Sequence, residues 1–200
     1  MEKTVKKDNN KKINIVRLML YISTVLILIS AVMCFVPFVV HKNSGVITKF
    51  AGIDFTKAMF TDEQSVKMEA VRSLLGSSKT KLVARTIAYL CPASLILSVV
   101  MCFLTMMSTF YKKLNNIFAV GLFFAVWVVL MMSVISLVGR LAVVKGVYVI
   151  NNYSVGIGVV VGVACVLTAS IINIVAAFML DAKPKPVSTL PKANIPPMGR

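Results

Sequence analysis

The chain has 200 residues, of which 58% are hydrophobic and only 14% are charged, and this composition excludes an ordinary soluble domain. Its net charge of +15 would suit nucleic-acid binding, but no basic motif interleaved with aromatic residues and no nucleic-acid module is present. The positive charge is better explained by attraction to anionic lipid beside apolar segments, at about 1 kcal/mol per basic residue.

Four long apolar runs make up most of the chain, and all seven acidic residues lie outside them. Each run has 23 to 26 residues, enough to cross about 30 Å of hydrocarbon as a helix. We therefore predict an all-α protein of the cell membrane, a four-transmembrane-helix bundle with a small extracytoplasmic cap. The predicted spans are 18–40, 86–110, 117–139 and 155–180.

The segment before the first span, residues 1–17, is predicted to be a basic tail, and its first 12 residues, which lack apolar periodicity, are predicted to be disordered. The first span continues into "FVPFVV" without a small-residue cleavage site, which favours an uncleaved helix over a signal peptide. Of the 22 basic residues, 12 lie in this tail, in the short link 111–116 and in the Pro- and Lys-containing tail 181–200. This distribution predicts that both termini are cytoplasmic. The basic residues expected at lipid head groups are Lys11, Lys12, Arg17, Lys112 and Lys113.

The long loop 41–85 contains a helix-start pattern in "TDEQSVKMEAVRSLLG", with Thr61 as the N-cap and Gln64 three residues later. Apolar residues then fall along one face up to Gly76, so we predict a helix over residues 61–75. The alternating "GVITKF" upstream and "GVYVINNY" after the third span are typical of short strands. These strands either pair in a small folded cap or belong to a loop whose helix lies on the bilayer surface.

Groups that perform chemistry are sparse in the spans. No ionisable residue occupies the middle of any span, and the only histidine, His41, follows the first one. Proton-coupled transport and catalysis within the membrane both need such groups, so we expect no enzyme activity, no cofactor and no metal site. The four cysteines are spread over three spans without a C-x-x-C motif and are interpreted as small apolar residues, with a disulfide between Cys34 and Cys91 as the alternative.

The last span contains small residues at helical spacing. Gly158 and Gly162 form a G-x-x-x-G motif, which lets two helix backbones approach closely in lipid. The same face continues through Cys165 and Ala169 to Asn173, whose amide could form a hydrogen bond to another helix. We predict that this face packs against a helix; the alternative is the wall of a permeation path.

The order of spans and loops resembles the claudin-like tetraspan plan: four spans, a long first external loop, a short inner link and a shorter second external loop. The Trp-Gly-Leu-Trp run and the two loop cysteines of claudins are absent here, since residues 41–85 hold neither residue type and Trp127 is in the third span. The chain is also similar to small four-helix bacterial membrane proteins, in its "FVPF" exit from the first span, its "GID" loop (52–54) and its "GIGVVVG" entry to the last. That likeness implies no particular activity.

The sequence therefore predicts a non-enzymatic integral membrane protein that acts by binding, as a scaffold, accessory subunit or sensor. Its expected partners are the lipid bilayer and another membrane protein or a second copy of itself, with no nucleic acid. The alternative is a transport component, either an oligomeric pore or a substrate-binding subunit of a larger transporter.

Overall fold

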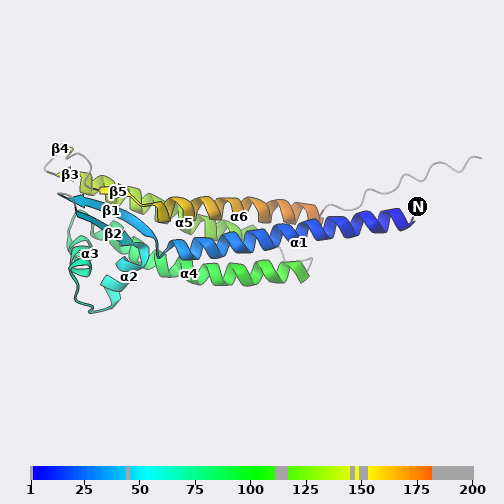
Figure 1. The fold of residues 1–200 in the computed structure, drawn as a ribbon, viewed down its shortest axis with the longest axis horizontal. Helices are drawn as coiled ribbons and strands as arrows, with labels where there is room; N and C mark the ends of the chain where they lie inside the picture. The colour runs from blue at the N-terminus through cyan, green and yellow to red at the C-terminus, as the bar shows by residue number, and fades with distance from the viewer. Residues whose placement is uncertain (1, 44–45, 111–116, 145–146, 149–152, 182–200) are drawn as a thin grey trace, which may run out of the picture.

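The computed structural model describes residues 2–43, 46–110, 117–144, 147–148 and 153–181. Four long helices lie side by side along the molecule (Figure 1), each with a stretch long and apolar enough to cross a membrane. Both α1 and α5 contact α4 and α6, so each helix has two neighbours in the bundle. The predicted set of four apolar helices is thus present. Their bounds are α1 (Glu2–Met33), α4 (Lys81–Phe110), α5 (Ile117–Ala142) and α6 (Ile157–Asp181).

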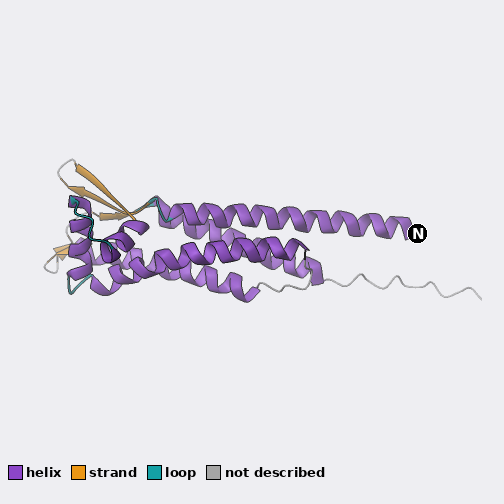
Figure 2. Ribbon diagram, turned by 90° about the horizontal axis from the view of Figure 1, so that it is seen from below, coloured by secondary structure: helices purple, strands orange, loops and turns teal. Residues whose placement is uncertain are grey.

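A smaller folded unit, here called the cap, covers the end of the bundle opposite the N-terminus (Figures 1 and 2). It contains two short helices and a three-stranded antiparallel sheet in the order β2-β1-β5. Its elements are β1 (Pro37–Asn43), β2 (Val46–Ala51), α2 (Gly52–Phe60), α3 (Val66–Gly76) and β5 (Tyr153–Val155). Two further strands, β3 (Val143–Val144) and β4 (Val147–Tyr148), pair only with each other.

The predicted strand in "GVITKF" is confirmed as β2, but its partner differs from the one expected. The strand predicted in "GVYVINNY" is described only as β4, which pairs with β3, and as Tyr153, the first residue of β5; residues 146 and 149–152 lie outside the described residues. Neither β4 nor β5 pairs with β2, which pairs with β1. Within β1, Val40 is opposite both Lys49 and Ser154. His41 stacks on Tyr153 with ring centroids 4.2 Å apart, which adds a side-chain contact to the β1–β5 pairing.

The predicted end of the first span is wrong. Helix α1 ends at Met33, residues 34–36 form a turn, and residues 37–40, also expected in the helix, belong to the central strand of the sheet. Pro37 has no backbone N–H and disfavours helical geometry at Val36. The β-branched residues that follow suit a strand, and β2 and β5 supply hydrogen-bond partners on both sides.

The N-terminal segment is also helical, which corrects the prediction of a disordered tail. Helix α1 begins at Glu2, and residues 2–12 contain neither glycine nor proline. Adding a residue to an existing helix costs much less than starting one, so the long apolar helix can extend into this polar segment. The other helices begin or end within five residues of the predicted bounds; the link 111–116 and residues 182–200 lie outside the described residues.

The loop between the first two spans contains two helices rather than one. Residues 52–54, expected in a loop, form the first turn of α2. The predicted N-cap, Thr61, instead follows the end of α2 and donates a hydrogen bond to Lys57 O. The N-cap of α3 is Ser65, whose hydroxyl accepts from Met68 N–H at 3.2 Å. Four apolar residues of α3 are buried: Met68, Val71, Leu74 and Leu75.

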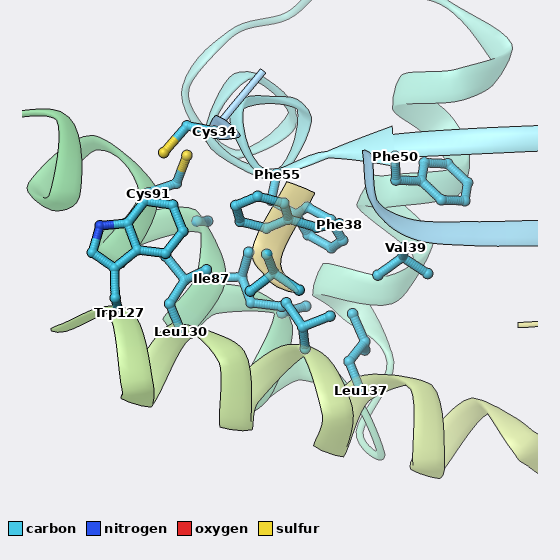
Figure 3. Packing of buried hydrophobic residues seen from close by; sticks show 14 of the residues in the cluster. Cys34, Phe38, Val39, Phe50, Phe55, Ile87, Cys91, Trp127, Leu130 and Leu137 are labelled. Carbon is cyan, nitrogen blue, oxygen red and sulfur yellow. The ribbon is translucent and has the colours of Figure 1, made fainter. Parts of the chain in front are cut away.

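The cap and the bundle share one hydrophobic core (Figure 3). Phe38 of β1 and Phe55 of α2 are fully buried, and the Phe38 ring meets Trp127 of α5 edge-on with centroids 6.5 Å apart. Ile87 of α4 and Leu130 of α5 belong to the same cluster. Because these aromatic side chains link the sheet to the helices, the cap is fixed on the bundle and its exposed side chains have defined positions.

Candidate functional sites: the packing face of α6 and the cap recess

The small residues at the start of α6 face the backbone of α1 and a tryptophan of α5. A Cβ atom added at Gly158 would lie 2.7 Å from Val36 O and 2.9 Å from Met33 O, where α1 ends. A Cβ added at Gly162 would overlap Cζ3 and Cη2 of the Trp127 ring. Both positions therefore place the α6 backbone closer to its neighbours than any side chain permits.

The same face reaches α1 again three turns later through polar contacts. The Asn173 amide donates to Ser23 Oγ at 2.5 Å and to Ala169 O at 2.9 Å. The Ser23 hydroxyl lies 3.3 Å from Ala169 O, to which it can donate. All three residues are buried, whereas Cys165 is only half-buried. These predicted packing residues are thus brought together against α1 and α5, with Cys165 at the margin.

A similar pair of small residues in the third span is not packed in this way. Gly121 and Ala125 repeat the four-residue spacing, but both are exposed, and a Cβ added at Gly121 would meet nothing within 4 Å. Spacing alone therefore does not identify a packed glycine; its neighbours in the fold do.

The residues predicted at lipid head groups are placed only in part. Arg17 is exposed, near the start of the apolar stretch of α1 that begins at Ile13. Lys11 and Lys12 belong to the polar extension of α1, and nothing is described of their side chains. Lys112 and Lys113 lie outside the described residues.

A proline in α4 creates a contact between the bundle and the cap that the sequence did not reveal. Pro92 cannot donate to Ala88 O, the carbonyl four residues earlier. The hydroxyl of Thr56 in α2 donates to that oxygen at 2.9 Å. The nearby serine hydroxyls do not reach this oxygen: Ser94 donates to Cys91 O and Ser98 donates to Ser94 O.

Two charged contacts hold the cap helices together. Asp54 is buried near the start of α2, where it accepts from Ala51 N–H and pairs with Lys67 of α3 at 2.6 Å. Arg72 of α3 donates to Ala58 O and Thr61 O, which places its charge at the carbonyl end of α2. None of these groups was predicted from the sequence, because residues 52–54 were expected in a loop; Asp54 in the first turn of a recognised helix would have been a favourable sequence signal.

An open recess lies where the α3–α4 connection meets the end of α5. It consists of two adjoining hollows of about 640 and 380 Å³ that share Lys79 and Arg140. The larger hollow is bounded also by Ser136 and Gly139, and the smaller by residues of α3 and its connection to α4. Together these residues define the cap recess.

The walls of the cap recess are held by local hydrogen bonds. Arg140 Nη1 donates to Lys79 O at 2.7 Å, which joins the end of α5 to the connection. The Thr80 hydroxyl donates to Leu74 O at 2.7 Å and fixes the turn that precedes α4. Two basic side chains line the recess and no carboxylate is among its described lining residues, so an anionic group would be favoured there.

No protein-family model, no curated protein and no solved structure matches this chain. The class of the protein therefore rests on its own features: four helices that could each cross a bilayer indicate a multi-pass membrane protein. On this basis the cap recess lies at the end of one span, because Ser136, Gly139 and Arg140 belong to the last two turns of the stretch Phe118–Leu141 of α5.

Proposed function

We propose that this protein is a non-enzymatic, multi-pass protein of the cell membrane that acts by binding, as a scaffold, accessory subunit or sensor. Its partner is another membrane protein that presents an anionic group to the cap recess. The observation that carries the proposal is the pair of basic residues, Lys79 and Arg140, in a recess without a described carboxylate. The rigid attachment of the cap through Phe38 and Trp127 supports it, since a fixed surface loses little conformational freedom on binding.

In this proposal both termini are cytoplasmic and the cap is extracytoplasmic. The support is the basic cluster before the first span, the feature that most strongly sets membrane orientation. Single cysteines introduced at positions 44 and 188 of a variant without native cysteines test the orientation. A membrane-impermeant maleimide applied to intact cells should label position 44 only; labelling of position 188 alone would reverse the assignment.

Partner capture tests the recess. The tagged protein is cross-linked in membranes, purified in a mild detergent and examined by mass spectrometry, beside Lys79→Glu and Lys57→Glu variants. Lys57 is an exposed basic residue of α2 that does not line the recess, so it is a control for charge alone. We expect a co-purifying membrane protein that is lost with Lys79→Glu and kept with Lys57→Glu. Equal recovery with all three proteins would contradict the proposal.

The alternative, a transport component, has one observation in its favour. Nine polar side chains are buried within the described parts of the bundle: Ser23, Thr24, Ser30, Ser94, Ser98, Thr105, Ser108, Ser170 and Asn173. Six of their hydroxyls donate to a carbonyl three or four residues earlier in the same helix, which occupies the groups that a solute path would need. Solute flux into vesicles that contain the purified protein, absent from empty vesicles, would favour this alternative.

A further inference from the structure

Two cysteines from distant parts of the sequence meet where the cap joins the bundle. Cys34 directly follows α1, and Cys91 precedes Pro92 in α4. Both are fully buried free thiols, their sulfur atoms point toward one another (Figure 3), and their side chains are hydrogen-bonded. The other two cysteines, Cys102 and Cys165, are only half-buried, and Cys102 Sγ makes its contact with Thr24 O.

We propose that Cys34 and Cys91 form a redox-active pair, whose oxidation to a disulfide covalently fastens the cap to the bundle. The proposal goes beyond the binding function above and does not depend on which partner the cap recess takes. An extracytoplasmic cap would place the pair nearer to the side of the membrane where disulfides persist, because Cys34 follows the cap end of one span and Cys91 lies in the half of α4 nearer to the cap.

The oxidant is a second disulfide, carried by an oxidised small thiol or by a thiol oxidoreductase. One thiol loses its proton and attacks a sulfur of that disulfide, which releases one thiol and leaves a mixed disulfide. The remaining cysteine, as thiolate, attacks the protein sulfur of the mixed disulfide and releases the second thiol. Two cysteine thiols and one disulfide thus become one protein disulfide and two released thiols, so that two electrons pass to the oxidant.

The surroundings of Cys34 suit it for the first attack. The pKa of the Cys34 thiol is lowered, and the main cause is hydrogen bonding to Cys91. Burial opposes this shift, whereas hydrogen bonding to Ser94 lowers the pKa further. The distance from Ser94 Oγ to Cys34 Sγ is 3.3 Å. Cys34 also lies in the short non-helical segment between α1 and β1, beside the exposed Phe35. Local opening of this segment exposes a thiol without unfolding a span.

The bond would join two points that control the position of the cap. Cys34 lies three residues before Pro37, the first residue of the central strand β1. Cys91 lies three residues after Ala88, whose carbonyl accepts the hydrogen bond from Thr56 of α2. Oxidation would therefore reinforce with a covalent bond the junction that packing and this hydrogen bond already form.

Thiol counting on the full-length protein tests the proposal. The protein, reduced and then purified in detergent, is incubated with oxidised glutathione, quenched in acid, unfolded in dodecyl sulfate and treated with a maleimide that adds a visible mass per thiol. We expect four reactive thiols before oxidation and two afterwards. Peptide mass spectrometry should find the linked pair 34–91.

Matched serine variants identify the pair. In Cys102→Ser and Cys165→Ser, oxidation should still remove two thiols, whereas in Cys34→Ser and Cys91→Ser no intramolecular bond should form. The wild type oxidised after unfolding shows whether the folded arrangement selects the pair, because bonds should then join other cysteines as well. Four thiols that persist in the folded wild type, a bond that includes Cys102 or Cys165, or a glutathione adduct that never resolves would each overturn the proposal.

Discussion

The contact between Gly162 and Trp127 predicts a large difference between two identical substitutions. Gly162→Ala adds one methyl group at a position where it would overlap two ring atoms of Trp127 and lie 3.0 Å from a third. Gly121→Ala adds the same group to α5 at an exposed position with nothing within 4 Å. Each change replaces a helical glycine with alanine, so the two variants differ only in what surrounds the new methyl.

The magnitude follows from two opposing terms. Replacing glycine with alanine in a helix stabilises it by about 1 kcal/mol. Overpacking in a close-packed interior typically costs about 1–3 kcal/mol, and Trp127 favours the upper value because its side chain is fully buried. We therefore expect Gly162→Ala to lower the free energy of unfolding by about 2 kcal/mol and Gly121→Ala to raise it by up to about 1 kcal/mol.

The measurement is thermal unfolding of the wild type and both alanine variants in the same detergent. A difference of about 3 kcal/mol corresponds to a separation of about 6–12 °C in melting temperature for a chain of this size. Trp127→Leu supplies a further control, because a smaller side chain leaves room for the new methyl. In that background Gly162→Ala should lose most of its cost.

Equal melting temperatures for Gly162→Ala and Gly121→Ala would refute the reasoning. Close packing would then not explain the small residues on this face of α6. The alternative, that the face is the wall of a permeation path, would gain support. A cost for Gly162→Ala that persists in Trp127→Leu would show instead that the methyl group disturbs some other neighbour.

Two further predictions concern polar contacts between distant elements, and stability in detergent checks both. Asn173→Leu removes the amide that donates to Ser23 Oγ and should lower the free energy of unfolding by about 1 kcal/mol. Most of this loss should vanish in a Ser23→Ala background. An unchanged loss in that background would assign the effect to packing alone. Thr56→Val leaves the buried Ala88 O without its donor and should lower the free energy of unfolding by about 1–3 kcal/mol. The loss should be much smaller in a Pro92→Ala background, because the backbone N–H of residue 92 can then replace the hydroxyl. Equal losses in both backgrounds would contradict this role of Thr56.

Local sequence signals located the elements more reliably than their ends. Alternation of apolar and polar residues identified β2, and apolar spacing identified most of α3. The N-cap of α3 was placed four residues too early, because Thr61 and Ser65 are both residues that cap helices well and only the contacts distinguish them. The wholly apolar segment that became β1 has no periodicity to distinguish a strand from a helix.

The candidate sites depended still more on the fold. The spacing of Gly158, Gly162 and Asn173 identified one face of α6 but not its neighbours, and the same spacing at Gly121 is exposed. The cap recess had no sequence signal, since Lys79 and Arg140 are 61 positions apart and each resembles any other basic residue near a span.

The sequence by itself determined the class of the protein and the number of its apolar helices, because apolar length and the exclusion of charge are properties of each segment alone. Only the tertiary structure decided where α1 stops and β1 begins, because a strand needs partners, and those in β2 and β5 come from two different loops. Only the fold brought Thr56 to Ala88 and Cys34 to Cys91. Such pairs form when separate segments pack together, and no local pattern records which segments will meet.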